Sequence, residues 1–582
     1  MTFVATAEQR AIIEGELIPQ CVIACPGSGK TTTSVRRLKE IRRRLGDGRG
    51  YAALLSYTNV AVNTFRGEYQ ALTVEMPDLS KRVYIGTVDA FLTAHVIRAH
   101  GQREMGAAKA PFLVGGSEAF LKGFTIYDGK YSRPITDLRV RFAESGKLEY
   151  LLQAPGKTAV PVDAATAVPI VEKLGKVGAY THQLGQYWAL RTLVNTDWLL
   201  EALCRRYPHI IVDEAQDVGP LHGAVLELLA AGGATISLVG DPNQGIYEFA
   251  GADGSVLRDY GTRVGVGGLS ISRNRRSVPA IVSVANRLTG ASSVAVRTPG
   301  PRKSGAYYVR YQETKLDDLM TAFAGILAAS QYSKEEAVVL CRGNSAVDRI
   351  SGGQKSAGSG ATSRFATAAV LRDRACDISE AFKATVDGFF RILDSTYDDL
   401  KRDVLAGRNN GEAKVLRRLL WDFMRSSAKG LPAANLPAKA KWHQELKLAL
   451  EVLMKAVELH TSLKRSATLG HNITAKDLPD GPLWEADLIK PEFKGIRVDT
   501  VHQAKGEGIP AVLYLARTGD IKKMLEGTSS EEGRIGYVAV TRARDLLILG
   551  VPTTVDKPML QSLETTGFLP WLGACNTVAA PV

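Results

Sequence analysis

The feature that most constrains the fold is the stretch CVIACPGSGKTTTSVRRLKEI at residues 21–41. Its opening residues, CVI, favour a β-strand, and its second half places Val35, Leu38 and Ile41 at helical spacing. Between them, PGSGKT fits the tail of the phosphate-loop pattern, with Ala24 where the first glycine usually stands. The stretch therefore predicts a strand, a loop and a helix, with backbone N–H groups turned toward an anion at the helix N-terminus.

The phosphate-loop pattern gives each of its residues an expected role. Lys30 should reach the β- and γ-phosphates of a nucleotide, and the Thr31 hydroxyl should ligate Mg²⁺. The alternative is an ordinary strand-to-helix turn, and the Gly-Lys-Thr ending argues against it. The pattern names a bound nucleotide but not the reaction that the nucleotide drives. The other residues of the stretch that we expect to contact the nucleotide are Pro26, Gly27, Ser28, Gly29 and Thr32.

Length and charge set outer limits on the kind of protein. A chain of 582 residues is too long for a single core and suggests about three or four domains. No run approaches the roughly 20 apolar residues of a membrane span, and the N-terminal MTFVATAEQR lacks the order of a secretory signal, so we expect a cytoplasmic protein without a membrane partner. The net charge of +13 indicates nucleic acid as a partner, unless it serves only solubility.

Strand-like and helical runs alternate in four parts of the chain, which predicts parallel sheets. The expected fold class is α/β, with two parallel-sheet domains in tandem and an inserted subdomain in each. Residues 1–100 and 195–272 should form the first domain, around a mixed α+β insertion at 101–194. Residues 273–350 and 492–560 should form the second, around a mostly helical insertion at 351–491 and before a tail at 561–582. Within that insertion, SGGQKSAGSGATSRF at 351–365 is expected to be a loop or linker.

Two adjacent carboxylates follow the apolar run HIIV at 209–212. Asp213 is expected to hold Mg²⁺ through water, and Glu214 to polarise the water that attacks the γ-phosphate, because in-line phosphoryl transfer needs both a metal and a positioned nucleophile. Adjacent carboxylates are more often solvated loop residues. The preceding strand and the upstream phosphate loop favour the catalytic interpretation.

These motifs and several others resemble, in order, those of the superfamily 1 helicases of the UvrD/Rep/PcrA group. The resemblance covers both α/β domains and implies tandem RecA-like motor domains that use ATP and Mg²⁺. It implies a protein that moves on single-stranded DNA, 3′ to 5′, and opens forked DNA as the two domains close on the nucleotide. The Asp-Glu-Ala-Gln-Asp motif at 213–217 is the hydrolysis motif of that family.

The resemblance extends to single residues. Gln9 falls where the family reads adenine, Gln244 where it senses the γ-phosphate, and Arg276 and Arg542 where it places arginine fingers. Glu507 is expected near the nucleotide. The residues expected to contact DNA are Tyr57, Thr58, Asn59, Thr87, Phe249 and His502. Tyr57 and Phe249 are candidates for stacking on bases, and a buried core aromatic is the alternative reading of each.

The sequence also departs from the family pattern. Arg275 replaces an adenine-stacking tyrosine, Asp89 replaces a common histidine, and Ala250 replaces an arginine. The KGEG sequence at 505–508 resembles helicase-like subunits of Gabija-type phage-defence systems. A second hypothesis follows from it, in which the chain is a DNA-sensing regulatory ATPase that works with a nuclease partner.

Overall fold

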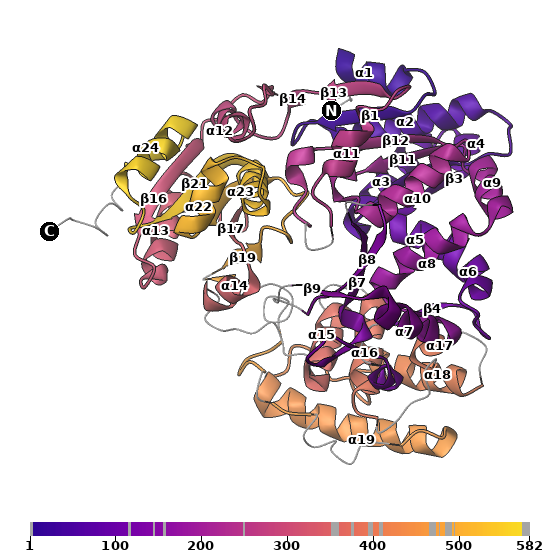
Figure 1. Ribbon diagram of the computed structural model, residues 1–582. Helices are drawn as coiled ribbons and strands as arrows, with labels where there is room; N and C mark the ends of the chain where they lie inside the picture. Colours follow the sequence, from indigo (N-terminus) through magenta and orange to yellow (C-terminus); the bar gives the residue numbers. More distant parts are fainter. Residues whose placement is uncertain are drawn as a thin grey trace.

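The computed structural model describes residues 4–114, 118–143, 146–154, 159–247, 251–350, 360–373, 378–393, 400–406, 411–464, 473–475, 478–483, 492–493 and 495–572. Figure 1 shows two α/β regions side by side in the upper half of the molecule and a third lobe below them. The fold class expected from the sequence is confirmed, because each upper region is built on its own parallel sheet.

The first sheet has six parallel strands in the order β13-β1-β12-β11-β2-β3. The strands read as short apolar runs because helices cover both faces, and β2 is buried along its whole length. The strands are β1 (Gln20–Ala24), β2 (Ala52–Ser56), β3 (Val83–Thr87), β11 (His209–Asp213), β12 (Thr235–Gly240) and β13 (Gly267–Ile271). Their helices include α1 (Ala7–Glu14), α2 (Lys30–Leu45), α3 (Asn59–Thr73), α5 (Val88–Leu92), α9 (Asp197–Arg206), α10 (Pro220–Ala231) and α11 (Ser255–Tyr260).

The second sheet has seven strands in the order β18-β19-β17-β20-β21-β16-β22. All pairs are parallel except β18 with β19. The strands are β16 (Gly305–Tyr311), β17 (Ala337–Cys341), β18 (Glu492–Phe493), β19 (Ile496–Thr500), β20 (Ile509–Leu515), β21 (Ala543–Pro552) and β22 (Leu569–Pro570). Their helices are α12 (Pro279–Thr289), α13 (Leu316–Ala329), α14 (Asn344–Ile350), α22 (Thr518–Leu525), α23 (Glu531–Arg542) and α24 (Lys557–Thr566).

The C-terminal boundary expected at residue 561 needs correction. It falls inside α24, which packs against α12 and α22. Beyond α24, β22 pairs with β16 and adds an edge strand to the second sheet. A two-residue strand leaves no alternation of apolar and polar residues, so β22 could not be detected from the sequence pattern. Residues up to 570 therefore belong to the second α/β domain.

The first insertion combines strands and helices, as expected. The strand pairs are antiparallel, β5 (Thr125–Tyr127) with β6 (Ser132–Pro134) and β7 (Leu138–Phe142) with β8 (Leu148–Leu152), and β9 (Val160–Val162) extends the second pair. The remaining elements are α6 (Arg98–Glu104), β4 (Phe112–Leu113), α7 (Ala164–Lys176), β10 (Ala179–Tyr180) and α8 (His182–Val194).

The second insertion is helical in its described part, with a hydrophobic core of its own. Its helices are α15 (Ala361–Asp373), α16 (Ile378–Phe390), α17 (Leu400–Ala406), α18 (Gly411–Arg425) and α19 (His443–His460). The loop expected over 351–365 ends earlier than predicted, because residues 361–365 belong to α15, whose Phe365 and Ala366 are buried in the core of the insertion. Residues 351–359 lie outside the described part of the chain.

The two insertions share the lower lobe of Figure 1. The guanidinium of Arg402 in α17 lies 5.3 Å from the centre of the Phe112 ring in β4, a cation–π contact between them. In the part of the chain that the structure describes, no helix is both long and apolar enough to span a bilayer.

Candidate functional site

The phosphate loop runs from the end of β1 to the start of α2, at the carboxyl edge of the first sheet. Gly27 and Gly29 both have positive φ, at 67° and 80°, which turns the loop and favours glycine. The buried Gln9 side chain donates from Nε2 to the Ser28 carbonyl at 3.2 Å. The hydroxyl oxygen of Ser28 is buried and has no hydrogen-bond partner in the described structure.

The two carboxylates lie at the end of β11, next to the phosphate loop. Lys30 Nζ lies 2.8 Å from Glu214 Oε2 and 3.9 Å from Asp213 Oδ1. Glu214 has a φ of 55°, a left-handed conformation that non-glycine residues adopt at a cost of about 1–3 kcal/mol and that clusters at functional sites. In this conformation the Glu214 carboxylate contacts Lys30, at the start of α2.

The electrostatics separate the two carboxylates. Burial raises the pKa of Asp213, although Lys30 opposes the shift. Burial also disfavours ionised Glu214, but Lys30 and Lys505 outweigh it and lower the pKa of Glu214. Asp213 Oδ2 is buried without a hydrogen-bond partner among the described residues, as expected for an oxygen that would face a hydrated cation.

The end of β12 adds a glutamine to the same cleft. Gln244 donates from Nε2 to Asp241 Oδ2 at 2.8 Å. The Tyr537 hydroxyl, from the second domain, donates to the same oxygen at 3.1 Å. Gln216 links the carboxylates to this group, since its Nε2 donates to Glu214 at 2.6 Å and its Oε1 accepts from the Asp241 N–H at 3.1 Å.

The second domain contributes two arginines to this cleft. Arg276 follows β14 (Arg273–Asn274), and a Cβ placed on Gly27 would collide with the Arg276 Cβ, so this residue lies directly against the phosphate loop. Arg542, at the end of α23, donates from Nη2 to Gln244 Oε1 at 3.2 Å. Burial and the neighbouring Arg276 lower the pKa of Arg542 to about 9, which leaves it protonated at neutral pH. Of the two residues proposed as arginine fingers, Arg276 therefore lies against the phosphate loop and Arg542 contacts Gln244 of the first domain.

An ion pair also joins the two domains. Lys505 Nζ lies 2.6 Å and 2.7 Å from the two carboxylate oxygens of Asp217, and 2.9 Å from the Gln244 carbonyl oxygen. Both side chains are nearly inaccessible, with exposed fractions of 8% and 3%. Neither residue is among the site residues expected from the sequence, although both lie inside expected motifs, Asp217 in DEAQD and Lys505 in KGEG.

Glu507, expected near the nucleotide, pairs its carboxylate with a residue of a neighbouring strand. Its carboxylate pairs with Arg497, with Nη1 to Oε2 at 2.7 Å. Its carbonyl oxygen accepts from Arg542 Nη1 at 3.1 Å. The backbone of Glu507 therefore positions Arg542, whereas its carboxylate binds Arg497 on β19. Its contact with the nucleotide stays a prediction.

Two of the threonines expected to contact DNA cap helices. Thr58 Oγ1 accepts from the Ala61 N–H at the start of α3, and Thr87 Oγ1 accepts from the Ala90 N–H at the start of α5. Asn59 is exposed beside the first of these caps. These caps fix the ends of two helices at the edge of the first sheet, and contact with DNA stays a prediction for all three residues.

Tyr57 is half-buried, and its ring lies edge-on to His222 with 5.5 Å between the ring centres. Its hydroxyl oxygen is buried without a hydrogen-bond partner among the described residues. His222 Nε2 lies 3.0 Å from Asp89 Oδ1. Phe249 lies outside the described residues. Stacking on bases stays a prediction for both aromatic residues.

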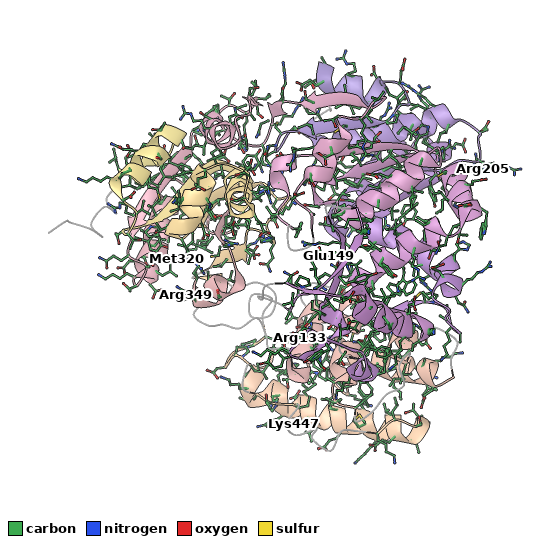
Figure 2. All side chains as sticks on the ribbon, viewed as in Figure 1. Arg133, Glu149, Arg205, Met320, Arg349 and Lys447 are labelled. Carbon is green, nitrogen blue, oxygen red and sulfur yellow. The ribbon has the colours of Figure 1, made fainter. Side chains whose placement is uncertain are left out.

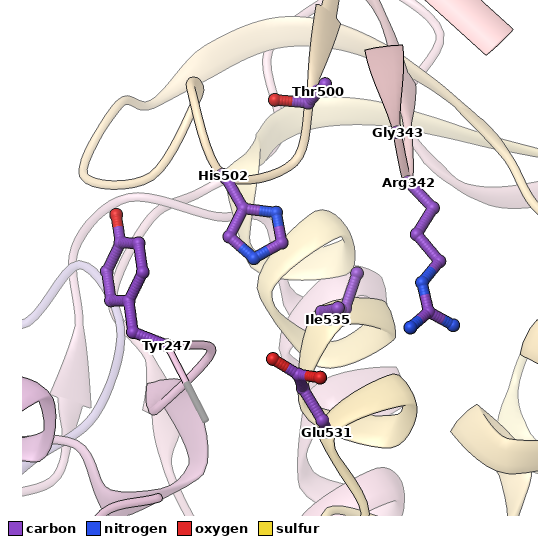
Figure 3. Close-up of a pocket in the computed structure, with 7 residues that line it drawn as sticks. All are labelled: Tyr247, Arg342, Gly343, Thr500, His502, Glu531 and Ile535. Atoms are coloured by element: carbon purple, nitrogen blue, oxygen red, sulfur yellow. The ribbon is translucent and has the colours of Figure 1, made fainter. Parts of the chain in front are cut away.

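His502 lies at the rim of the cleft between the domains. It lines a hollow of about 390 Å³ together with Tyr247, Arg342, Thr500 and Glu531 (Figure 3). His502 Nε2 lies 2.9 Å from the Ile246 carbonyl oxygen, across the domain boundary. Burial lowers the pKa of His502, which favours the neutral ring. The residue therefore joins the two domains, and its contact with DNA stays a prediction.

The observed groups fit ATP and Mg²⁺. The loop would hold a triphosphate at the N-terminus of α2, and the Thr31 hydroxyl and Asp213 would ligate Mg²⁺ in part through water. Among the described residues, no group of three or more His, Cys, Asp or Glu side chains could hold a metal ion. The geometry defines a P-loop NTPase with two motor domains.

Comparisons with known proteins narrow this class to a family. Residues 179–263 match the UvrD/REP helicase N-terminal domain, and residues 464–553 match the UvrD-like helicase C-terminal domain. The ATP-dependent DNA helicase UvrD2 of Mycobacterium tuberculosis is 25% identical over 628 aligned residues, which cover 99% of this chain and 82% of UvrD2. The chain therefore resembles the UvrD-like superfamily 1 helicases in both of its motor domains, which supports an ATP-hydrolysing DNA helicase.

Two further relatives are more distant or shorter matches. A probable DNA helicase II homologue of Mycoplasma genitalium is 22% identical, over 65% of this chain and 59% of its own length. The RecBCD enzyme subunit RecB of Mycolicibacterium smegmatis is 45% identical over 49 residues, which cover 8% of this chain and 4% of RecB.

Proposed function

We propose that this chain is an ATP-driven motor that moves along single-stranded DNA, 3′ to 5′, and separates duplex DNA at a fork. The observation that supports it most is the reach of Arg276 and Arg542, carried by the second domain, to Gly27 and Gln244 of the first. An ATPase needs charge neutralisation at the nucleotide, and here the cations for it come from the opposite domain.

Each residue of the cleft has a defined task in hydrolysis. Lys30 and the loop N–H groups bind the triphosphate, and Glu214 accepts a hydrogen bond from the attacking water and aligns it. Mg²⁺, when bound at Thr31 and Asp213, supplies Lewis-acid stabilisation of the phosphate oxygens. Lys30 therefore exchanges its partner Glu214 for phosphate oxygens when the nucleotide binds, which frees that carboxylate to orient water.

Coupling to motion follows from how many contacts join the domains. Polar contacts cross the cleft to groups of the first domain from several second-domain side chains, including Lys505, Thr528, Arg534, Tyr537, Arg542 and His502. Each of these second-domain side chains contacts a group within the segment 241–246, which lies beside the proposed site of the γ-phosphate. Loss of the γ-phosphate would therefore change the contacts of the second domain with this segment. Repeated opening and closing of the cleft would then move the two domains along a DNA strand.

The choice of DNA as the track rests on the family and on charge. The chain carries a net charge of +13, and its relatives are named as DNA helicases. A cationic surface with aromatic side chains binds single strands without reading sequence. The direction of movement is taken from the family alone.

Two measurements test this function. ATP turnover should rise on adding single-stranded DNA, and Lys30→Ala should abolish turnover while DNA binding persists. A fork with a 3′ single-stranded tail should be unwound, whereas a matched substrate with a 5′ tail should not. Preference for the 5′ tail would contradict the direction, and DNA-independent turnover would contradict the motor itself.

The second candidate function is a DNA-sensing ATPase that regulates a nuclease. The short match to RecB supports it, because RecB is by name a subunit of the multi-subunit RecBCD enzyme. This candidate predicts DNA-stimulated ATP turnover without strand displacement from either tail. The relatives reported above are named for helicases or for that enzyme, so a role in phage defence stays a prediction.

A further inference from the structure

A cationic hollow lies on the second insertion, away from the motor cleft. Its volume is about 270 Å³, and it is lined by Lys414, Arg417, Arg418 and Trp421 of α18. Figure 1 shows α18 in the lower lobe, whereas α23, which carries Arg542, lies in the upper part of the molecule. The hollow therefore cannot contact the same nucleotides as the cleft.

The sequence of α18 places its cations on one face. Lys414, Arg418, Trp421 and Arg425 follow one another at spacings of three and four residues, so they form a single stripe along the helix. The opposite face buries Leu416, Leu420 and Phe423 in the core of the insertion. The stripe is the outer face of a helix whose other side is fixed by packing.

The cations of the stripe are not neutralised as in an ordinary solvated face. Within the described part of the chain, no carboxylate forms an ion pair with Lys414, Arg418 or Arg425. Glu412, near the start of the helix, bonds instead to Ser462, at 2.8 Å between Oε1 and Oγ. Like charges one helical turn apart repel each other, so a bound anion would stabilise this row of cations.

The aromatic wall of the hollow is held in place. The Trp421 ring packs against Phe382 of α16 with 4.9 Å between the ring centres. The Arg417 guanidinium lies 4.9 Å from the centre of the same Phe382 ring and donates to the Leu405 carbonyl at 3.0 Å. Trp421 is only half-buried, so part of it faces the hollow between the cations.

We propose that this hollow binds a nucleotide unit of single-stranded DNA, with a base stacked on Trp421 and phosphates on Lys414 and Arg418. Cations that follow a backbone, together with an aromatic side chain that accepts any base, are the two components of sequence-independent single-strand binding. The inference rests on the proposed function for its choice of DNA. It adds a second contact that holds DNA outside the motor cleft.

The test compares DNA lengths and two kinds of variant. Binding is measured by fluorescence anisotropy with oligo(dT) of about 10 nucleotides, within the site size of one groove, and of about 40 nucleotides, which can reach both sites. Replacing Lys414 and Arg418 together by alanine should lower the slope of log K against log salt by about 1.4 for the long DNA only. Trp421→Ala should weaken long-DNA binding by about 5- to 150-fold without changing that slope, and Trp421→Phe should restore most of it.

The matched control replaces Lys447 and Lys455, two exposed lysines of α19 in the same insertion, by alanine. Figure 2 labels Lys447 in the lower lobe. The control has the same change in charge and should bind both lengths as the unmodified protein does. Thermal unfolding of each variant checks that the insertion still folds, and the exposed cation pair provides a test even if Trp421→Ala is unstable.

The outcomes separate this proposal from the motor function. Unchanged binding of long DNA in the cation and Trp421 variants would overturn the proposal and leave the hollow to another partner, such as an acidic protein segment. An equal loss in the lysine control would overturn it as well, because the effect would then be general charge. Failure of short DNA to stimulate ATP turnover in the unmodified protein would count against the motor function alone.

Discussion

The ion pair between Lys505 and Asp217 gives the sharpest test of how the two domains cooperate. Lys505→Met removes the charge and keeps a side chain of similar length. It leaves Asp217 buried without its cation and the Gln244 carbonyl without its donor, since Nζ lies within 2.9 Å of both groups. Burial already raises the pKa of Asp217 to about 6, so the site tolerates an uncompensated carboxylate poorly.

The size of the effect follows from the burial of the pair. Removing one partner of a buried ion pair costs about 3–5 kcal/mol. Each domain has its own core, and opening the cleft lets water reach Asp217, so the cost falls on closure rather than on folding. A cost of about 3 kcal/mol corresponds to a factor of about 150 in the closing equilibrium.

The assay is DNA-stimulated ATP turnover, with nucleotide binding and thermal unfolding measured beside it. Lys505→Met should lower kcat by about 100-fold or more, with little change in unfolding temperature. The double variant with Asp217→Asn should recover much of the loss, because no charge is then left buried. Lys522→Met, at an exposed position on α22, is the control and should be silent. Turnover within about threefold of normal in Lys505→Met would refute the idea that this pair holds the closed cleft.

Three further predictions concern single positions. Glu214→Gln should abolish ATP turnover and leave DNA binding intact, and residual hydrolysis near the normal rate would assign the alignment of water to another group. Gly27→Ala should block closure of the cleft, because the added Cβ would collide with the Arg276 Cβ. The expected result is loss of ATP turnover with normal DNA binding. Gly67→Ala is the control and should have no effect, because its added Cβ would meet open space. The hydrogen bond to Asp89 raises the pKa of the half-exposed His182, so its stabilising contribution is complete below about pH 6.5 and is lost as pH rises through the folded-state pKa. His182→Ala should therefore lower the unfolding temperature at pH 6, by less than about 4 °C, and leave it unchanged at pH 9, and an equal effect at both pH values would refute the charge-based explanation.

The local parts of the site could be predicted because each is formed by a short segment of the sequence. The loop around Lys30 and the carboxylates after β11 depend on a few consecutive residues, and the structure places them at one edge of the first sheet. Thr58 and Thr87 also follow a local rule, since each begins a helix and its hydroxyl caps it. The capping role can be read from the sequence, because each threonine directly precedes a helical run.

The contacts between domains could not be predicted in the same way. Lys505 and Asp217 are separated by 288 residues, and nothing local tells which charges will meet when two domains dock. The partner of Glu507 could not be predicted either, because its carboxylate forms an ion pair with Arg497 on the neighbouring strand β19. The order of motifs identified the two halves of the cleft, and only the fold shows how they are paired.

The order of strands in the second sheet has a consequence for biosynthesis. β16 and β17 are made before the helical insertion, yet they are not neighbours, and every strand that pairs with either of them lies after residue 492. A nascent chain therefore carries two apolar strands with open edges while more than a hundred further residues leave the ribosome. Such edges invite mispairing between chains, so recombinant yield should depend on chaperones and slow translation. A fragment that stops within the insertion should be insoluble even though its first domain is complete.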